Sequence, residues 1–159
     1  IFQDPELCWE VPIPRRKLKD IKRSRRAVKM DQHFDESKHQ DLVDFCQATG
    51  LRRHELVAVT PLDVYWQNEK LIAYVRQGKG GKAREVTVLQ GTELRLLQII
   101  EGRPPGKPIF AKIPTTMDVH SYRAQYAAAR LEQAEIIEVS RDLGHNRTDV
   151  IRGHYAGRR

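Results

Sequence analysis

Apolar positions recur along the chain with two different periods, and each period predicts a different kind of element. From residue 36 to residue 59, apolar residues return every three to four positions, the spacing of a helix with one buried face. Between residues 63 and 89 the period changes to two, which is typical of strands with one buried face. Helical spacing returns from residue 92 onward. The pattern therefore predicts an α+β domain that is mainly helical and contains three antiparallel strands.

Capping residues and chain-breaking residues give these elements their ends. Asp35 can cap the first helix, Gly50 suits the left-handed conformation that follows many helices, and Pro61 ends the second helix. The predicted helices cover residues 36–48, 52–59, 92–101, 119–133, 135–143 and 148–153. The predicted strands cover residues 63–66, 71–76 and 84–89, with turns at 67–69 and 77–82.

The net charge of +7 is concentrated in one segment near the start of the chain. Residues 15–29 hold nine basic residues and only one acidic residue, Asp20, so the remainder of the chain sums to about −1. A solvated linker or a localisation signal would have this composition, and so would a segment that contacts a DNA backbone. We favour DNA contact because phosphate chemistry is indicated further along the chain. Residues 1–29 are accordingly expected to be a basic linker or an N-terminal extension.

Length and composition narrow the class of protein. A chain of 159 residues is expected to form one compact domain, and no apolar run approaches the roughly 20 residues of a membrane span. No secretion signal is apparent, and Cys8 and Cys46 match no metal or disulfide spacing, so we expect a cytoplasmic protein with reduced thiols. The six histidines form no ligand spacing with the cysteines and carboxylates do not cluster, so no metal or cofactor is expected. Because the chain begins at Ile1, we expect it to be a piece of a longer protein.

Six residues of phosphodiester chemistry occur in a fixed order along the chain: Arg52, Lys79, His120, Arg123, His145 and Tyr155. Cleavage of a phosphodiester requires neutralisation of the charge that builds up on phosphorus, and a guanidinium presents a planar fork of donors suited to that task. Arg123 lies three residues after His120, so the two share a helical face. The two histidines are candidates for contact with the phosphate and for proton transfer. Taken singly, each of these residues is more often an ordinary surface residue.

The ordered series resembles the catalytic domain of tyrosine recombinases, a family that includes phage integrases, Xer-type resolvases, Cre and the integrases of conjugative transposons. The residues that carry the resemblance are Thr49-Gly50-Leu51-Arg52-Arg53-His54-Glu55-Leu56, Gly78-Lys79-Gly80-Gly81-Lys82, His120-Ser121-Tyr122-Arg123, Leu143-Gly144-His145 and Tyr155. It runs from about Met30 to Tyr155, which implies a catalytic domain over residues 30–159 with helices packed around the small sheet.

The resemblance also implies roles for individual residues. Tyr155 would be the nucleophile that forms a 3′-phosphotyrosyl link, and Lys79, in the hairpin where the family carries a catalytic lysine, would protonate the leaving 5′ oxygen. Lys82 is the competing lysine. The other four tyrosines lie within predicted strands or helices and are less suitable nucleophiles. Tyr155 lies ten residues after His145, an interval found among transposon-type integrases, whereas His154 occupies the commoner nine-residue position.

The implied activity is site-specific recombination of double-stranded DNA without metal or ATP, by a mobile-element integrase acting as a tetramer on paired sites. No membrane or small-molecule substrate is implied. Two departures stand out: His120-Ser121-Tyr122-Arg123 replaces the commoner His-Asp/Glu-Leu-Arg, and no N-terminal core-binding domain is expected in this chain. Two alternatives stay open, a type IB topoisomerase and a non-catalytic DNA-binding regulator that retains the fold.

Overall fold

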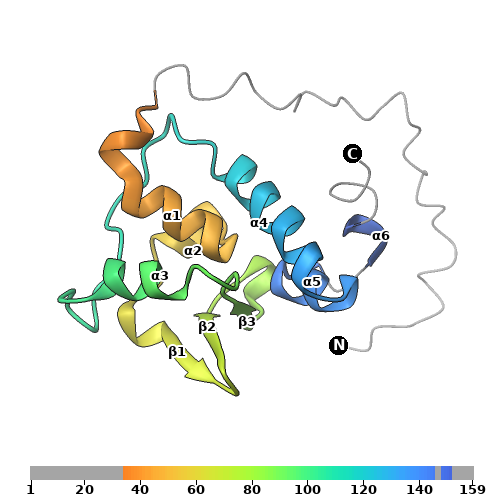
Figure 1. The fold of residues 1–159 in the computed structure, drawn as a ribbon. Coiled ribbons are helices and arrows are strands. Elements are labelled where there is room, and N and C mark those ends of the chain that lie inside the picture. Colours follow the sequence, from red (N-terminus) through yellow and green to blue (C-terminus); the bar gives the residue numbers. More distant parts are fainter. Residues whose placement is uncertain (1–33, 146–147, 152–159) are drawn as a thin grey trace, which may run out of the picture.

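The computed structural model describes residues 34–145 and 148–151. The basic segment 15–29, Cys8, His154 and the predicted nucleophile Tyr155 lie outside the described residues. Within the described ranges, helices and a small sheet form one body (Figure 1).

The first predicted helix is present, although its first turn is a 3-10 helix. Asp35 caps that turn, Glu36–His39, by accepting a hydrogen bond of 3.1 Å from the backbone N–H of Ser37. Helix α1 then runs Gln40–Thr49 and ends at Gly50, which has φ 59° and donates its N–H to the carbonyl of Cys46. Both predicted end signals are thus confirmed.

The second helix is shorter than predicted. Instead of covering residues 52–59, α2 is a single turn, Arg53–Leu56, followed by a 3-10 turn at Pro61–Asp63. Two features of the sequence account for the early end: the β-branched Val57 and Val59 favour a helix weakly, and Pro61 requires an extended residue before it. Thr60 has that extended conformation, with φ −114° and ψ 164°.

The predicted three-stranded antiparallel sheet is confirmed, with the strand order β1-β2-β3. The strands are β1 (Val64–Gln67), β2 (Lys70–Val75) and β3 (Arg84–Thr87). Asn68 and Glu69, with φ 46° and 63°, turn β1 into β2, as a two-residue hairpin requires. Strand β3 ends before the predicted Leu89, because the N–H of Leu89 bonds to the carbonyl of Ala48 in α1 rather than to the sheet.

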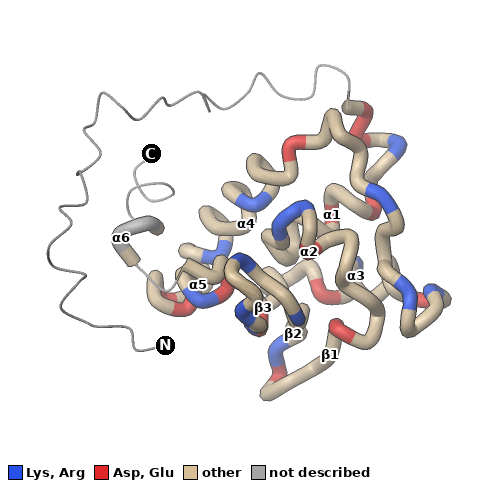
Figure 2. Tube along the Cα trace, turned by 180° about the vertical axis from the view of Figure 1, so that it is seen from behind, with Lys and Arg blue, Asp and Glu red and all other residues tan. Residues whose placement is uncertain are grey.

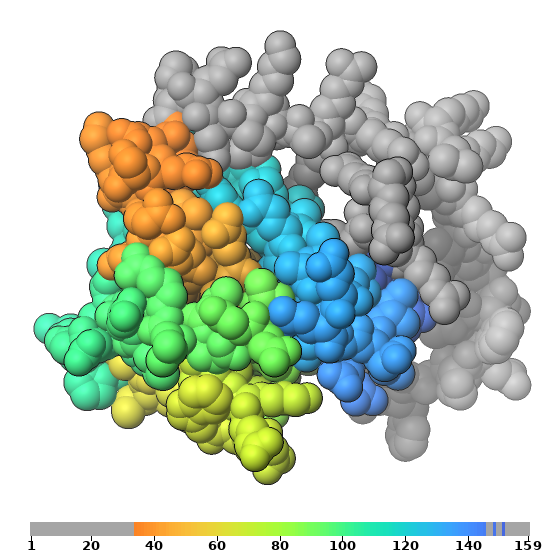
Figure 3. Space-filling view, in the orientation of Figure 1, coloured from red at the N-terminus to blue at the C-terminus, as the bar shows by residue number. Residues whose placement is uncertain are grey.

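The remaining helices agree with the predicted ranges to within a few residues. They are α3 (Glu93–Ile100), α4 (Val119–Gln133), α5 (Ile136–Asp142) and α6 (Thr148–Ile151). Helix α1 packs against α3 and α4, while α5 packs against β3 and α6. Figure 3 shows these elements as one continuous body, from the orange α1 to the blue α4 and α5. Fully buried side chains at its centre include Phe45, Leu51, Leu56, Val86, Leu96, Tyr126, Val139 and Leu143.

Cys46, in α1, lies in this core. Its thiol is free, and burial raises its pKa to about 12 in spite of the nearby positive charge of Arg53. Such a thiol is unreactive at neutral pH. Among the described residues, no helix is both long and apolar enough to cross a membrane.

Candidate active site

The C-terminal end of α5 is the centre of the site. Gly144, at φ 63°, ends the helix: its N–H donates to the carbonyl of Arg141 at 2.8 Å, and the N–H of His145 donates to the carbonyl of Ser140 at 2.9 Å. This pattern satisfies two of the last helical carbonyls. The carbonyls of Asp142 and Leu143 come next, and both accept hydrogen bonds from arginine side chains of other elements.

Arg52 and Arg123 converge on the carbonyl oxygen of Leu143. Arg52, at the N-terminus of α2, donates Nη2 at 3.0 Å, and Arg123, in α4, donates its own Nη2 to the same oxygen. Arg123 also donates Nη1 to the carbonyl of Gly50 at 2.5 Å. Because the C-terminus of a helix carries partial negative charge, it holds two guanidinium groups side by side that would otherwise repel. Figure 2 marks basic positions on both α2 and α4 in blue.

The two arginines differ in their access to solvent. Arg123 is 3% exposed, whereas the side chain of Arg52 is 18% exposed. His145 follows Gly144 directly, is half-buried, and lies two residues after Leu143, whose carbonyl oxygen both arginines bond. The structure therefore brings together Arg52, Arg123 and His145, which the sequence separates into three motifs.

Glu55 is an acidic residue of the site whose role the sequence did not reveal. Its side chain is 1% exposed and accepts from Arg52 twice, through the backbone N–H at 2.8 Å and through Nη1 at 3.0 Å. Arg84 donates two further bonds, of 2.7 and 2.8 Å. Burial would raise the pKa of Glu55, but the hydrogen bonds and charges of Arg84 and Arg52 outweigh it and lower the pKa from 4.5 to about 2. Glu55 is therefore an anion that orients Arg52.

Lys79 lies in an exposed 3-10 turn, Lys79–Gly81, between β2 and β3. The preceding Gly78 is buried at the base of the turn, where a Cβ atom would lie 3.6 Å from Oε1 of Glu55. The turn thus begins close to the carboxylate of Glu55, and Lys79 lies on its exposed part. Lys82 is also exposed, so the preference for Lys79 over Lys82 stays a prediction.

His120 occupies the first turn of α4, one turn before Arg123. Its backbone N–H donates to Oδ1 of Asp118 at 2.9 Å, which caps the helix, and the residue is exposed. Its place on the same helix as the buried Arg123 puts it toward the rim of the site.

The last described segment, α6, packs against α5 a few residues before the predicted nucleophile. Helix α6 contacts α5, and Ile151, four residues before Tyr155, is fully buried. The position of Tyr155 itself lies outside the described residues, so its role, like the roles of the five described candidates, stays a prediction.

The sequence analysis also did not predict a second buried polar cluster, which is formed by Tyr126, Arg130 and Asp142. The hydroxyl of Tyr126 lies 2.7 Å from the carbonyl oxygen of Thr87 and 3.1 Å from Oδ2 of Asp142, which also accepts from Nε of Arg130 at 3.1 Å. Burial raises the pKa of Asp142, although its hydrogen bonds and Arg130 act in the opposite direction. The sequence did carry one signal: Tyr126 and Arg130 are four residues apart on one helix and so share a face.

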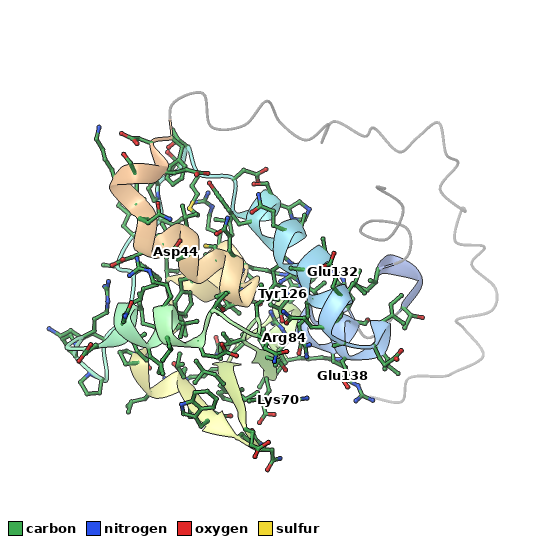
Figure 4. The ribbon with its side chains drawn as sticks, viewed as in Figure 1. Asp44, Lys70, Arg84, Tyr126, Glu132 and Glu138 are labelled. Carbon is green, nitrogen blue, oxygen red and sulfur yellow. The ribbon has the colours of Figure 1, made fainter. Side chains whose placement is uncertain are left out.

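The cluster also determines how accessible the hydroxyl of Tyr126 is. Tyr126 is fully buried, and burial first, then the charge of Asp142, raises the pKa of its hydroxyl well above 10. Figure 4 labels Tyr126 and Arg84 where α4, α5 and the sheet meet. A phenol held in this way is inaccessible at the molecular surface. The sequence ranks Tyr126 as a less suitable nucleophile than Tyr155, and the choice of Tyr155 stays a prediction.

Metal binding has no support in the described residues, among which no group of three or more histidine, cysteine or acidic side chains could hold an ion. The positive charge at the site comes from Arg52 and Arg123.

Comparison with known proteins gives matches among solved structures only. No family model matches the chain, and no curated protein does. The XerH site-specific recombinase, in a post-cleavage complex with palindromic difH substrate, matches with a TM-score of 0.54 and 18% identity, covering 74% of this chain and 41% of XerH. The Tn1549 transposon integrase, bound to circular intermediate DNA, matches with a TM-score of 0.52 and 17% identity, covering 77% of this chain and 55% of the integrase.

These matches define the class of fold. The chain has the fold of a tyrosine recombinase catalytic domain, with its helices and three-stranded antiparallel sheet. XerH and the Tn1549 integrase are two of the proteins whose structures it resembles, and it spans about half the length or less of those two chains.

Proposed function

We propose that this chain is the DNA-cleaving domain of a site-specific recombinase of the integrase type. It would cut and rejoin double-stranded DNA through a 3′-phosphotyrosyl intermediate on Tyr155, without metal or ATP. The proposal is supported above all by the convergence of Arg52 and Arg123 on the carbonyl oxygen of Leu143, two residues before His145, because two neighbouring guanidinium groups suit the recognition of one phosphate.

The proposed chemistry balances without an outside energy source. The phenolic oxygen of Tyr155 forms a bond to phosphorus as the bond from phosphorus to the 5′ oxygen breaks. One of the two candidate histidines, His120 or His145, would accept the proton that the phenol loses, and Lys79 would supply the proton that the leaving oxygen takes up. Arg52 and Arg123 would stabilise the charge on the non-bridging oxygens, with His120 and His145 as further donors. Since one phosphoester replaces another, the 5′ hydroxyl of a partner strand can reverse the step. Strand exchange by a tetramer on paired sites is part of the proposal.

Two alternatives share parts of this picture. A type IB topoisomerase would form the same covalent link but would rejoin the original strand, and a DNA-binding regulator would form no link. Retention of all six candidate residues favours an enzyme over the regulator. Joining of two differently labelled duplexes is expected from the recombinase and not from the topoisomerase.

Covalent trapping tests the proposal directly. The full chain is incubated with a pool of nicked suicide duplexes whose sequence is randomised around the cleavage position, and protein–DNA adducts are separated by denaturing electrophoresis. We expect wild-type protein and a Tyr65→Phe control to form an adduct, and Tyr155→Phe to form none while keeping its DNA affinity. Adduct at wild-type yield from Tyr155→Phe would refute the assignment of Tyr155. Absence of any adduct from the wild type would refute the proposal that the chain is a DNA-cleaving enzyme.

The same assay tests the absence of a metal requirement. Because arginine and lysine side chains supply the positive charge, we expect EDTA to leave the adduct yield unchanged. A loss in EDTA that added Mg²⁺ restores would contradict the mechanism.

A further inference from the structure

We infer that Arg84 is a positioning residue that sets the relative places of the three segments carrying Arg52, Lys79 and His145. The roles of these three residues in catalysis rest on the proposed function. The connection through Arg84 rests on contacts within the protein and can be tested separately.

Arg84 joins α2 to the end of α5 through its guanidinium group. It is the first residue of β3, and its side chain is 11% exposed. Nη1 and Nη2 donate to the two carboxylate oxygens of Glu55 at 2.7 and 2.8 Å, and Nε donates to the backbone carbonyl of Asp142 at 2.9 Å. Glu55 in turn holds Arg52, so one charged group fixes the start of α2 against the helix end that precedes His145.

Gly78 and Gly144 both lie close to the side chain of Arg84. A Cβ atom at Gly78 would lie 2.7 Å from Nη1 of Arg84, and one at Gly144 would lie 3.1 Å from its Cδ. Gly78 immediately precedes Lys79, and Gly144 immediately precedes His145. The absence of a side chain at both positions therefore lets the Lys79 turn and the His145 segment approach Arg84 from different elements.

Arg84 acts through its neighbours rather than on DNA. Both of its terminal nitrogens donate to Glu55 and its Nε donates to the carbonyl of Asp142, so its donors are engaged within the protein. A lysine at this position would keep the charge but could not make the two-pronged contact with Glu55 together with the bond to Asp142. The Arg84→Lys substitution thus removes the geometry and retains the charge.

Amide hydrogen exchange tests the connection without DNA. Three amides report on the three segments: Arg52 N–H bonds to Glu55, Gly78 N–H to Lys82, and His145 N–H to Ser140. In Arg84→Lys, we expect all three amides to exchange faster together, by tenfold or more. The matched control is Arg103→Lys, since Arg103, like Arg84, donates from its guanidinium to backbone carbonyl and carboxylate oxygens, in its case the carbonyls of Ile99 and Ile109 and the carboxylate of Asp41. It should leave the three amides unchanged. Faster exchange of the Arg52 amide alone would overturn the inference.

Single-turnover cleavage separates positioning from a general loss of folding. A misplacement of about 1 Å can cost on the order of a hundredfold in rate. We therefore expect Arg84→Lys to lower the cleavage rate constant about a hundredfold at an unchanged reaction amplitude, with Arg103→Lys at the wild-type rate. A lowered amplitude with an unchanged rate constant would mean that Arg84 only stabilises the fold, and would overturn the inference.

A second variant keeps the test decisive if Arg84→Lys does not fold. Gly78→Ala puts a Cβ atom 2.7 Å from Nη1 of Arg84 and 2.7 Å from the carbonyl oxygen of Lys82, so it strains the hairpin and pushes on Arg84 from that side. If Arg84 connects the segments, the His145 amide at the end of α5 should exchange faster in this hairpin variant, and an unchanged His145 amide would count against it. Failure of the wild type to form any adduct would overturn the proposed function only, because the exchange measurements do not depend on cleavage.

Discussion

Gly50 meets two requirements that no other residue type satisfies together. Its φ of 59° is unfavourable for any residue with a side chain, and a Cβ atom there would lie 2.4 Å from Cδ1 of the buried Tyr126 ring. Its carbonyl also accepts the 2.5 Å bond from Arg123, so the same turn that ends α1 holds a predicted catalytic arginine.

Substitution of Gly50 should therefore be costly. The left-handed conformation costs a residue with a Cβ atom roughly 1–2 kcal/mol, and overpacking costs about 1–3 kcal/mol more. We expect Gly50→Ala to lower the free energy of unfolding by about 2–5 kcal/mol in urea titrations. Gly80→Ala is the matched control, because Gly80 has φ 75° but a Cβ atom there meets nothing within 4 Å; it should cost only about 1–2 kcal/mol. An equal decrease in the free energy of unfolding in Gly50→Ala and Gly80→Ala would show that the Tyr126 ring moves aside at no cost.

Lys79 can be distinguished from Lys82 by the leaving group. A 5′-bridging phosphorothiolate leaves readily without a proton, so it should bypass a missing general acid. We expect Lys79→Ala to cleave ordinary DNA at least a hundredfold more slowly than wild type and the phosphorothiolate nearly as fast, in line with the usual contribution of general acid catalysis, about 10²–10⁴-fold. Lys82→Ala should cleave both substrates like wild type. Equal impairment of Lys79→Ala on both substrates would assign Lys79 to DNA binding.

At the scale of elements, the buried carboxylate of Glu55 couples α2 to β3 in a pH-dependent way. Its pKa in the folded protein, about 2, is below its ordinary value of 4.5. Glu55 therefore contributes stability that is fully present above about pH 4.5 and is lost as the pH falls toward 2. A difference of this size corresponds to about 3 kcal/mol.

Chemical denaturation across this pH range measures that contribution. We expect Glu55→Gln to be less stable than wild type at pH 7, with the difference shrinking steadily between pH 4.5 and pH 2. Asp142 changes the stability in the opposite direction over this pH range, because burial raises its pKa. Asp142 is present in both proteins, so the quantity to compare is the difference in unfolding free energy between wild type and Glu55→Gln. A difference that does not change with pH would show that the ion pairs with Arg52 and Arg84 contribute little.

At the scale of the whole molecule, charge is divided between a described body and a basic segment outside it. Residues 15–29 carry a net charge of +8, while the rest of the chain sums to about −1. If the segment contacts DNA, each phosphate contact adds roughly 0.9 to the slope of log affinity against log salt concentration.

Deletion of the residues before Met30 tests this division. We expect the truncated protein to bind all duplex sequences more weakly by about the same factor and to show a flatter salt dependence in fluorescence anisotropy titrations. A control with every basic residue of 15–29 replaced by glutamine should behave like the deletion. An unchanged slope in both would show that the candidate site alone supplies the affinity.

The features of this protein that depend on near neighbours along the chain could be predicted from the order of its residues. Periods of two and of three to four residues, together with Asp35, Gly50 and Pro61, were enough to predict the sheet, its antiparallel order and most helix bounds, because capping and backbone geometry act within a few residues. The order of the six candidate residues likewise indicated the fold that the solved structures confirm.

How those residues are held depends on contacts between segments that lie far apart along the chain. The bond from Arg52 to Leu143 joins residues 91 positions apart, and the bonds from Arg84 to Glu55 join residues 29 positions apart, so neither leaves a local pattern in the sequence. The length of β3 was also decided by a distant contact, the bond from the N–H of Leu89 to the carbonyl of Ala48 in α1. For the arginines and Glu55 the physical reason is that a buried charge takes whichever partner the packed elements bring to it, and that choice exists only once the chain is folded.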